Sequence, residues 1–359
     1  MENTLVVHTF GTKCVEWYSC IITRDIQQSV KMKIEIDNLL DDIAHDESLL
    51  TYYGLVNYRH SLLMEDVQKR LEVSEQDIEQ SQSDIFLNYM FYFLKGQEKF
   101  HKGKYKSAIK LYNSASKHIE KVESNIEQAE FYYKVGIAYY RLNQYAVAMS
   151  YIEQAKDIFS ISKDTLEKTL NCDSVTACIY SETEDFKKAD KLFTSAIEKA
   201  LEFPNTYALL LRAHANNLLR QDRLNEAEKY MEDAISVTEH KSSYVGLKSM
   251  SELANIKLRL NKTDEGIRLL EEAEKEALSV QNYEYIERNR ITRCLYVFYN
   301  ESILEESIQS LINKGFYFEV FEVATEISKY FEEKDDLNKT SNYLKLALQM
   351  HIKQIELGE

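Results

Sequence analysis

Residues 108–115 read AIKLYNSA, and the same arrangement returns as AMSYIEQA at 148–155, ADKLFTSA at 189–196, AEKYMEDA at 227–234 and GIRLLEEA at 266–273. Each copy places a small residue first and last and a large apolar residue fifth. The closing alanines are 40, 41, 38 and 39 residues apart, and another small residue precedes each copy by twelve positions. Small residues at these offsets let the two helices of a hairpin approach closely, so the pattern predicts stacked helical hairpins.

The repeats also predict the fold class. Their period exceeds the roughly 34 residues of a tetratricopeptide repeat, which predicts longer helices. A weaker copy closes on Ala347, and the 74 residues between Ala273 and Ala347 leave room for one degenerate repeat near Tyr283 to Lys314. With one proline and nine glycines in 359 residues, the chain is poor in residues for tight turns. We therefore expect an all-α protein with a right-handed superhelix of about seven tetratricopeptide-like hairpins.

The chain before the repeats predicts a separate domain. Residues 1–64 hold three amphipathic segments, near 14–23, 26–44 and 48–64, which indicate a three-helix bundle. Residues 65–84 are polar and densely charged and predict a mobile, partly helical linker. Residues 85–359 form the repeat domain in this interpretation.

Charge and apolar content exclude several classes of partner. The 44 lysines and arginines against 59 aspartates and glutamates give a net charge of −15, which argues against a nucleic-acid partner. The first 64 residues show no basic recognition helix, so a DNA-binding helix-turn-helix is disfavoured as well. No stretch reaches the roughly 18 apolar residues of a membrane span, and the N-terminus lacks the pattern of a signal peptide. Five scattered cysteines without a CxxC pair agree with a reducing compartment, so we expect a cytoplasmic protein without a membrane partner.

The search for catalytic motifs finds none that would serve a self-contained metabolic enzyme. The eight histidines form no HxxxH or HExxH pattern, and no cysteine pair has the spacing of a zinc site. The glycine patterns that hold dinucleotides or phosphates are missing, as is the GxSxG pattern of a nucleophilic serine. We therefore expect no metal and no cofactor, and we interpret the aromatic stripes at repeat positions as helix packing.

Four stretches of the first half resemble the Rap proteins of Bacillus and relatives. They are Val15-Glu16-Trp17-Tyr18, DESLLTYYGL at 46–55 followed by Tyr58-Arg59-His60, LNYMFYFLKG at 87–96, and IEQAEFYYK at 126–134. The resemblance implies a three-helix bundle that docks a bacterial response regulator, joined by a flexible linker to seven tetratricopeptide-like hairpins. Some Rap proteins promote hydrolysis of the aspartyl-phosphate on the regulator of the sporulation phosphorelay. Others sequester a DNA-binding regulator such as that of competence.

Peptide control in quorum sensing is the second property that the resemblance implies. A short Phr peptide, secreted and re-imported, binds the concave face of the repeats in such proteins and releases the target. The family places asparagines on successive first helices of the hairpins, and those positions hold Ile179 and Ala213 here. Glu182, where an acidic residue is expected, and Asn216, one turn after Ala213, are then the candidate peptide-binding residues.

The resemblance also assigns candidate residues for the regulator. In phosphatase members, a glutamine at the start of the third bundle helix positions the attacking water, and this chain has Glu47 at that position. A carboxylate would be repelled by the phosphoryl group, or would act as a general base if its pKa were raised. Without the resemblance, residues 46–48 read as a helix cap. The remaining candidates for contact with the regulator are His45, Asp46, Leu50, Tyr58, Phe86 and Glu127.

Three functions remain open from the sequence. The first is a peptide-regulated protein that binds a response regulator and dephosphorylates it or blocks its activity. The second is sequestration of a DNA-binding regulator without hydrolysis, which Glu47 favours because it replaces the catalytic glutamine. The third is a generic repeat scaffold for unrelated proteins.

Overall fold

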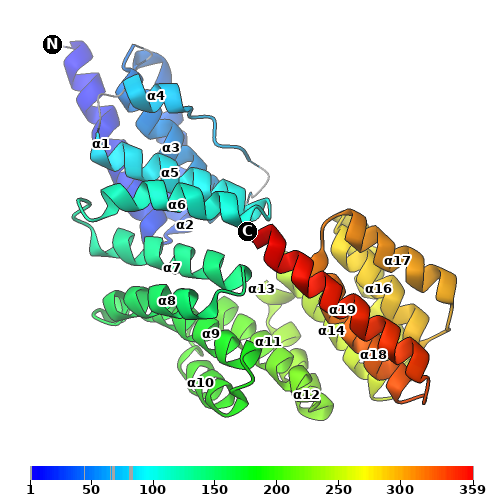
Figure 1. Ribbon diagram of the computed structural model, residues 1–359. Helices are drawn as coiled ribbons and strands as arrows, with labels where there is room; N and C mark the ends of the chain where they lie inside the picture. The colour runs from blue at the N-terminus through cyan, green and yellow to red at the C-terminus, as the bar shows by residue number, and fades with distance from the viewer. Residues whose placement is uncertain (1, 44, 65, 67–68, 81–83, 359) are drawn as a thin grey trace. The chain divides into compact units, whose positions relative to one another are not determined.

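The computed structural model describes residues 2–43, 45–64, 66, 69–80 and 84–358, and the residues so described form helices and no strand (Figure 1). The chain divides into two compact units, residues 1–158 and 159–359. None of the helices in the described ranges is long and apolar enough to cross a bilayer. The prediction of an all-α, tetratricopeptide-like protein is confirmed.

The first unit begins with a helical bundle. Its helices are α1 (Glu2–Ile22), α2 (Ile26–Asp37), the short 3-10 helix η1 (Leu40–Ile43) and α3 (Glu47–Leu63). Phe10, Trp17, Ile36 and Leu55 are fully buried between them, so each helix turns an apolar face to one core. The second helix ends at Asp37, seven residues before the predicted end at Ala44, which lies outside the described residues.

The first helix is longer than the predicted segment at 14–23, because it begins at Glu2. Phe10, in the added part, has no exposed surface, and Gly11 lies beside Leu49 of α3. One buried aromatic residue and one glycine do not form a helical pattern that the sequence alone reveals.

The predicted linker packs where the structure describes it. Residues 65, 67–68 and 81–83 of the predicted segment lie outside the described residues. The helix α4 (Glu75–Gln80) contacts both α3 and α5, and Ile78 is buried. Leu71 and Val73 are half-buried against the same core. Three apolar side chains thus pack this segment on the core, although most of its residues are polar or charged.

The repeat helices continue through both units. The first unit contains α5 (Ile85–His101), α6 (Tyr105–Ile119), α7 (Asn125–Arg141) and α8 (Tyr145–Phe159), whose last residue falls in the second unit. The second unit contains η2 (Lys163–Thr165), α9 (Leu166–Glu182), α10 (Phe186–Lys199), α11 (Pro204–Arg220), α12 (Leu224–Ser236), α13 (Thr238–Lys241), α14 (Tyr244–Arg259), α15 (Thr263–Ser279), α16 (Tyr283–Tyr296), α17 (Glu301–Asn313), α18 (Tyr317–Glu332) and α19 (Leu337–Gly358). The interval predicted to hold a degenerate repeat therefore contains α16 and α17.

The repeat residues pack as their spacing predicts. Ala108, Tyr112 and Ala115 of α6 are buried, and a Cβ atom placed on Gly96 of α5 would overlap the ring of Tyr112. The same ring lies 6.3 Å, centroid to centroid, from Phe131 of the next hairpin. The large residue of the repeat thus fills space within its own hairpin and also reaches the following one.

A common turn joins the two helices of many hairpins. Its middle residue has a positive φ angle, close to 60° in Asn143, Glu184, Asp222 and Asn261. Glycine takes this left-handed position only at Gly103 and Gly315 among the described residues. Residues with a side chain adopt this conformation at an energetic cost, and helices in other proteins often place glycine here. These turns of the chain therefore carry some backbone strain.

Candidate functional site

The beginning of α3 presents the residues predicted to meet a response regulator. Asp46 is the N-cap of α3, where its Oδ1 accepts a hydrogen bond of 3.0 Å from the backbone N–H of Leu49. Glu47 follows in the first helical turn with its side chain exposed, and His45 is exposed before the cap. The positive end of the helix dipole favours both carboxylates. Asp46 therefore has a structural role, while Glu47 and His45 remain available at the surface.

Leu50 and Phe86 extend this region over a neighbouring aromatic cluster. Leu50 is half-buried, and so is Phe86 in the first turn of α5. The Phe86 ring packs edge-on against Tyr18 of α1 at 5.7 Å and lies 6.4 Å from the ring of Tyr52. Phe86 thus links three helices of the first unit and keeps part of its side chain accessible.

Arg59 and Glu127 form a buried ion pair within the first unit. Nη1 of Arg59 on α3 donates to Oε2 of Glu127 on α7 at 2.9 Å and to the hydroxyl of Tyr18 at 2.7 Å. The hydroxyl of Tyr89 on α5 donates to the same Glu127 oxygen at 3.2 Å. Arg59 is 9% exposed and Glu127 only 1%. Burial lowers the pKa of Arg59, but Glu127, Tyr18 and Tyr89 together outweigh this effect and hold the pKa above its ordinary value.

This pair changes the interpretation of two predicted contact residues. Glu127 is enclosed in the ion pair, and Tyr58 is only 2% exposed. Contact of Glu127 and Tyr58 with a regulator stays a prediction, and in this conformation neither side chain presents a surface to one. The physical reason is that the first turn of α7 packs close to α3, where a buried guanidinium requires a carboxylate partner.

The second unit brings the two predicted peptide-binding residues close to an arginine that the sequence analysis did not single out. Nη2 of Arg220, at the end of α11, donates to Oε1 of Glu182, at the end of α9, at 2.6 Å. Asn216 lies one turn before Arg220 on the same helix and is half-buried. Ile179, at an expected asparagine position, is buried at 3% exposure and Ala213 packs against an apolar cluster. Arg220 occurs at the i+4 position from Asn216, which was the available signal in the sequence.

Charged residues on the first helices of successive hairpins extend this site. We call them the charge row: Glu182, Arg212, Arg220, Lys248, Glu252, Glu284, Arg288 and Glu322. Glu322 of α18 lies 3.6 Å from Arg220 and 3.2 Å from Arg288. Lys248 and Glu284 are 3.1 Å apart, between α14 and α16. The charge row therefore joins helices of different hairpins through alternating charges.

Part of the charge row is buried and incompletely paired. Nη2 of Arg212 donates to Oε1 of Glu252 at 2.5 Å, and the hydroxyl of Tyr285 donates to the same oxygen at 2.8 Å. Nε of Arg212 and Oε2 of Glu252 are buried without a hydrogen-bond partner. An unpaired N–H donor and an unpaired carboxylate oxygen are the kinds of group that a peptide backbone can satisfy with its C=O and N–H groups.

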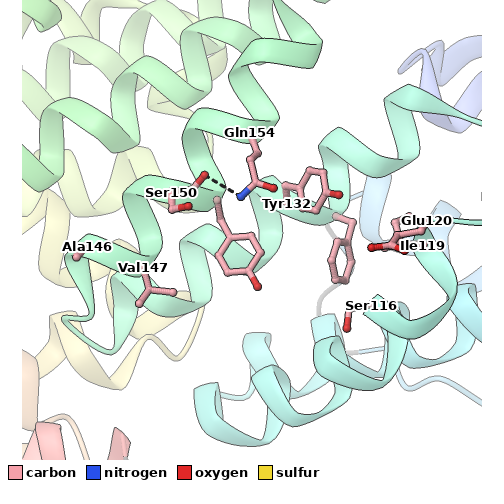
Figure 2. Close-up of a pocket in the computed structure, with 10 residues that line it drawn as sticks. Ser116, Ile119, Glu120, Tyr132, Ala146, Val147, Ser150 and Gln154 are labelled. Carbon is pink, nitrogen blue, oxygen red and sulfur yellow. Dashed lines mark hydrogen bonds between the residues drawn. The ribbon is translucent and has the colours of Figure 1, made fainter.

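A cavity of about 590 Å³ lies elsewhere in the first unit, between α6, α7 and α8 (Figure 2). Figure 2 shows the ring of Tyr132 beside this space, with Glu120 and Gln154 at its border. None of the residues predicted to bind a regulator or a peptide lines this cavity. Within the described parts of the chain, no group of three or more His, Cys, Asp or Glu side chains gathers as a metal site.

Comparison with protein families matches two parts of the chain. Residues 5–65 match the family model described as response regulator aspartate phosphatase H, N terminal. Residues 129–160 match a tetratricopeptide repeat model. The first match spans the bundle α1–α3, and the second spans most of α7 and α8.

Curated relatives that align over nearly the whole chain include the following two. "Response regulator aspartate phosphatase I" of Bacillus subtilis (strain 168) is 25% identical over 359 residues, which cover 97% of this chain and 91% of that protein. "Type II methyltransferase M.CeqI" of Rhodococcus hoagii is 38% identical over 357 residues, which cover 97% of this chain and 68% of that protein. The methyltransferase name describes the Rhodococcus protein, about a third of whose length lies outside the match.

Solved structures share the fold. A crystal structure of a Rap protein complexed with competence and sporulation factor superposes with a TM-score of 0.85 at 23% identity, covering 98% of this chain and 99% of the other. The Rap conjugation gene regulator of the plasmid pLS20, solved with a Phr peptide, has a TM-score of 0.74 at 23% identity, covering 98% and 97%. At these identities the likeness establishes the fold.

Proposed function

The chain belongs to the Rap family, and from this premise we propose that it is a cytoplasmic regulator that binds a bacterial response regulator and is controlled by a short peptide. We assign the regulator to the exposed beginning of α3, around His45, Glu47 and Leu50. We assign the peptide to the charge row of the second unit. The match of residues 5–65 to the N-terminal Rap model supports the first assignment, and the peptide complexes of proteins with this fold support the second.

The side chain of Glu47 supports blocking of the target rather than hydrolysis. Glu47 is exposed at the start of α3, the position from which a glutamine orients water in phosphatase members. An amide orients a water molecule without adding charge, whereas a carboxylate repels the oxygens of a phosphoryl group. We therefore propose that the protein occupies its regulator and leaves the aspartyl-phosphate intact. Exposed Glu47 at the helix start is the observation that carries this proposal.

A label-retention assay tests the proposal. The full chain, a Glu47→Gln variant and a Glu198→Gln control are each mixed with a radiolabelled, phosphorylated response regulator, and bound complex and remaining label are followed. Glu198 is an exposed glutamate on α10, far along the chain from the bundle. We expect the native chain and the control to bind without speeding loss of label, and the Glu47→Gln variant to speed it.

Three results would overturn parts of this proposal. Loss of label with the native chain, as fast as with Glu47→Gln, would assign hydrolysis to the protein and remove blocking as its mode of action. Absence of binding by the native chain to every response regulator of the organism would remove the regulator as a partner. Equal effects of Glu47→Gln and Glu198→Gln would show that the beginning of α3 is not the contact.

The charge row supports a peptide with both backbone and charge recognition. Glu182 offers an acidic group and Arg220 a basic group. Their side chains are 11% and 32% exposed, respectively. Asn216 adds an amide that can both donate and accept. Arg212 and Glu252 keep one unpaired donor and one unpaired acceptor. A peptide that replaces some of these internal ion pairs with its own charges would gain affinity without leaving a buried charge unpaired.

A further inference from the structure

The cavity between α6, α7 and α8 plays no part in the proposed function, and we call it the α6–α8 cavity (Figure 2). It lies within the first unit, and most of its lining comes from α6 and α8, the second helices of two successive hairpins. The charge row, in contrast, lies on first helices of hairpins. A volume of about 590 Å³ falls within the usual range for pockets that bind ligands.

Tyrosine rings form one wall of the α6–α8 cavity. Tyr132 of α7 and Tyr151 of α8 both line it, and their ring centroids are 6.3 Å apart. The ring of Tyr139 stacks on Tyr151 at 5.7 Å, with the two planes only 6° apart. Phe131 meets Tyr132 edge-on at 5.8 Å. These contacts hold both tyrosine rings in place, so the wall is preorganised for a ligand that stacks on an aromatic face.

Glu120 supplies the charge of the α6–α8 cavity. It is the one charged side chain among the ten residues that line the cavity in the described part of the chain. Its carboxylate forms no ion pair and accepts no hydrogen bond within the described ranges. Burial, followed by the charge of Glu120, raises the pKa of Tyr132. The carboxylate therefore lies close enough to act on the Tyr132 hydroxyl.

The position of Glu120 gives no advantage to its own helix. Glu120 is the C-cap of α6, where the negative end of the helix dipole disfavours a carboxylate. The last turn of α6 carries Lys117, whose positive charge suits this end. Helix stability therefore does not explain an unpaired carboxylate at the border of an aromatic cavity, and a cation is the ligand that it favours.

We propose that the α6–α8 cavity binds an arginine side chain of a peptide or protein segment, with the guanidinium stacked on the Tyr132 ring and paired with Glu120. A neutral ligand that covered Glu120 would leave a desolvated carboxylate without a partner, at a large cost. A guanidinium is planar, stacks on aromatic rings and donates two parallel hydrogen bonds to a carboxylate. The ammonium group of lysine is compact and strongly hydrated, so it fits this combination less well.

The remaining lining of the α6–α8 cavity suits an arginine that is part of a longer segment. Val147 is 40% exposed and offers apolar surface to the methylene groups of the arginine. Nε2 of Gln154 donates to the carbonyl of Ser150 at 3.1 Å, which leaves Oε1 to accept from a backbone N–H. Ser116 and Ser150 are exposed and add hydroxyl groups at the border. Free arginine would leave these groups unused.

Isothermal titration calorimetry of the full chain with capped pentapeptides tests the proposal. The probe is acetyl-Gly-Gly-Arg-Gly-Gly-amide, and the matched peptides carry lysine or citrulline in place of arginine. Citrulline has the shape of arginine without its charge. We expect the citrulline peptide to have a dissociation constant at least tenfold higher, equivalent to about 1.4 kcal/mol, and the lysine peptide to fall between the two. Free L-argininamide should bind more weakly than the arginine peptide.

Variants of the chain locate the bound peptide. Glu120→Gln removes the charge at an exposed position and is expected to raise the dissociation constant of the arginine peptide at least tenfold. Tyr132→Leu removes the aromatic face and should weaken binding, whereas Tyr132→Phe keeps that face and should retain most of it. Glu153→Gln is the matched control, because Glu153 is exposed on α8 and does not line the cavity. Circular dichroism should show the same helix content in all four variants.

Several outcomes would overturn the proposal. Equal affinity for the arginine and citrulline peptides would remove the cation as the recognised group. Unchanged affinity in both Glu120→Gln and Tyr132→Leu would place the peptide outside the α6–α8 cavity, as would equal weakening by Glu153→Gln. Binding of L-argininamide as tight as that of the arginine peptide would replace a peptide segment with a free small molecule as the occupant. Absence of any measurable heat at millimolar peptide would leave the cavity without this ligand.

Discussion

His60 lies in the core of the bundle with its Nδ1 atom held as an acceptor. The Nε1–H of Trp17 donates to this atom at 3.4 Å, and Oγ of Ser29 lies 2.9 Å from it. An indole N–H can only donate, so Nδ1 of His60 must be unprotonated for this contact to exist. Burial, followed by the charges of Lys33 and Lys69, lowers the pKa of His60 below its ordinary value of 6.5.

We predict that the bundle loses stability as the pH falls below about 6.5. In that range the unfolded chain binds a proton at His60 and the folded chain does not, so protonation favours unfolding. His60→Gln should reduce the slope of thermal stability against pH, and the exposed His45→Gln should leave it unchanged. Equal slopes in both variants would contradict this role of His60.

The buried pair of Arg59 and Glu127 predicts strong coupling between the bundle and the first repeat helices. Removing either partner alone leaves a buried charge without compensation, at a cost of about 3–5 kcal/mol. We expect Glu127→Leu and Arg59→Leu each to lower the free energy of unfolding by this amount, and the double variant to lose far less than the sum. Urea unfolding in a double-mutant cycle measures the coupling.

The i,i+4 pair of Lys102 and Glu98, with side chains 41% and 12% exposed, supplies the control for this cycle. These residues are one turn apart on the end of α5. Such pairs contribute about 0.3–0.5 kcal/mol, so their cycle should show little coupling. Additive costs at Arg59 and Glu127 would mean that the ion pair adds nothing to the attachment of the bundle.

Within the helices, some glycines are needed for close packing and others are not. Gly96 lies against the ring of Tyr112, whereas a Cβ atom on Gly11 of α1 would lie 3.6 Å from Leu49, an ordinary contact distance. We predict that Gly96→Ala destabilises the chain by about 1–3 kcal/mol through overpacking. Gly11→Ala should instead stabilise it by about 0.5–1 kcal/mol, because alanine is the better helix former. Thermal unfolding of both variants measures the difference, and a gain in stability at Gly96 would contradict the packing account.

The helices were largely predictable because their determinants repeat. Ala108, Tyr112 and Ala115 are one of five copies of a spacing that has a single geometric meaning, and all three are buried. The start of α1 and the packing of Ile78 were missed, since each depends on isolated residues whose tertiary neighbours decide their burial. The left-handed turn residues were missed as well, because Glu184 and Gln281 occupy positions where the usual signal is glycine.

The candidate sites were less predictable than the helices. The resemblance located the beginning of α3, where Glu47 is exposed, but it also assigned the buried Glu127 to contact with the regulator. The Arg59–Glu127 contact joins residues 68 positions apart, and that separation follows no local period. Arg220 lies one turn after Asn216 in the sequence, but its partners Glu182 and Glu322 lie on two other hairpins, and no local pattern indicates them.

For the whole molecule, the two units receive different roles in this account. The first unit offers Glu47 and its neighbours to a response regulator, and the second offers the charge row to a short peptide. The net charge of −15 suits a partner with a basic contact surface, because complementary charge raises the rate of encounter. We propose that the peptide acts by releasing the regulator, so the two ligands oppose each other through the same chain.

Binding of a response regulator to the immobilised full chain tests this account most directly. Each response regulator of the source organism is passed over the chain in a surface plasmon resonance experiment, first alone and then with its candidate signalling peptide. We predict that at least one regulator binds, that Glu47→Lys weakens it while Glu198→Lys does not, and that a short peptide releases it. Absence of binding by every regulator would contradict the account.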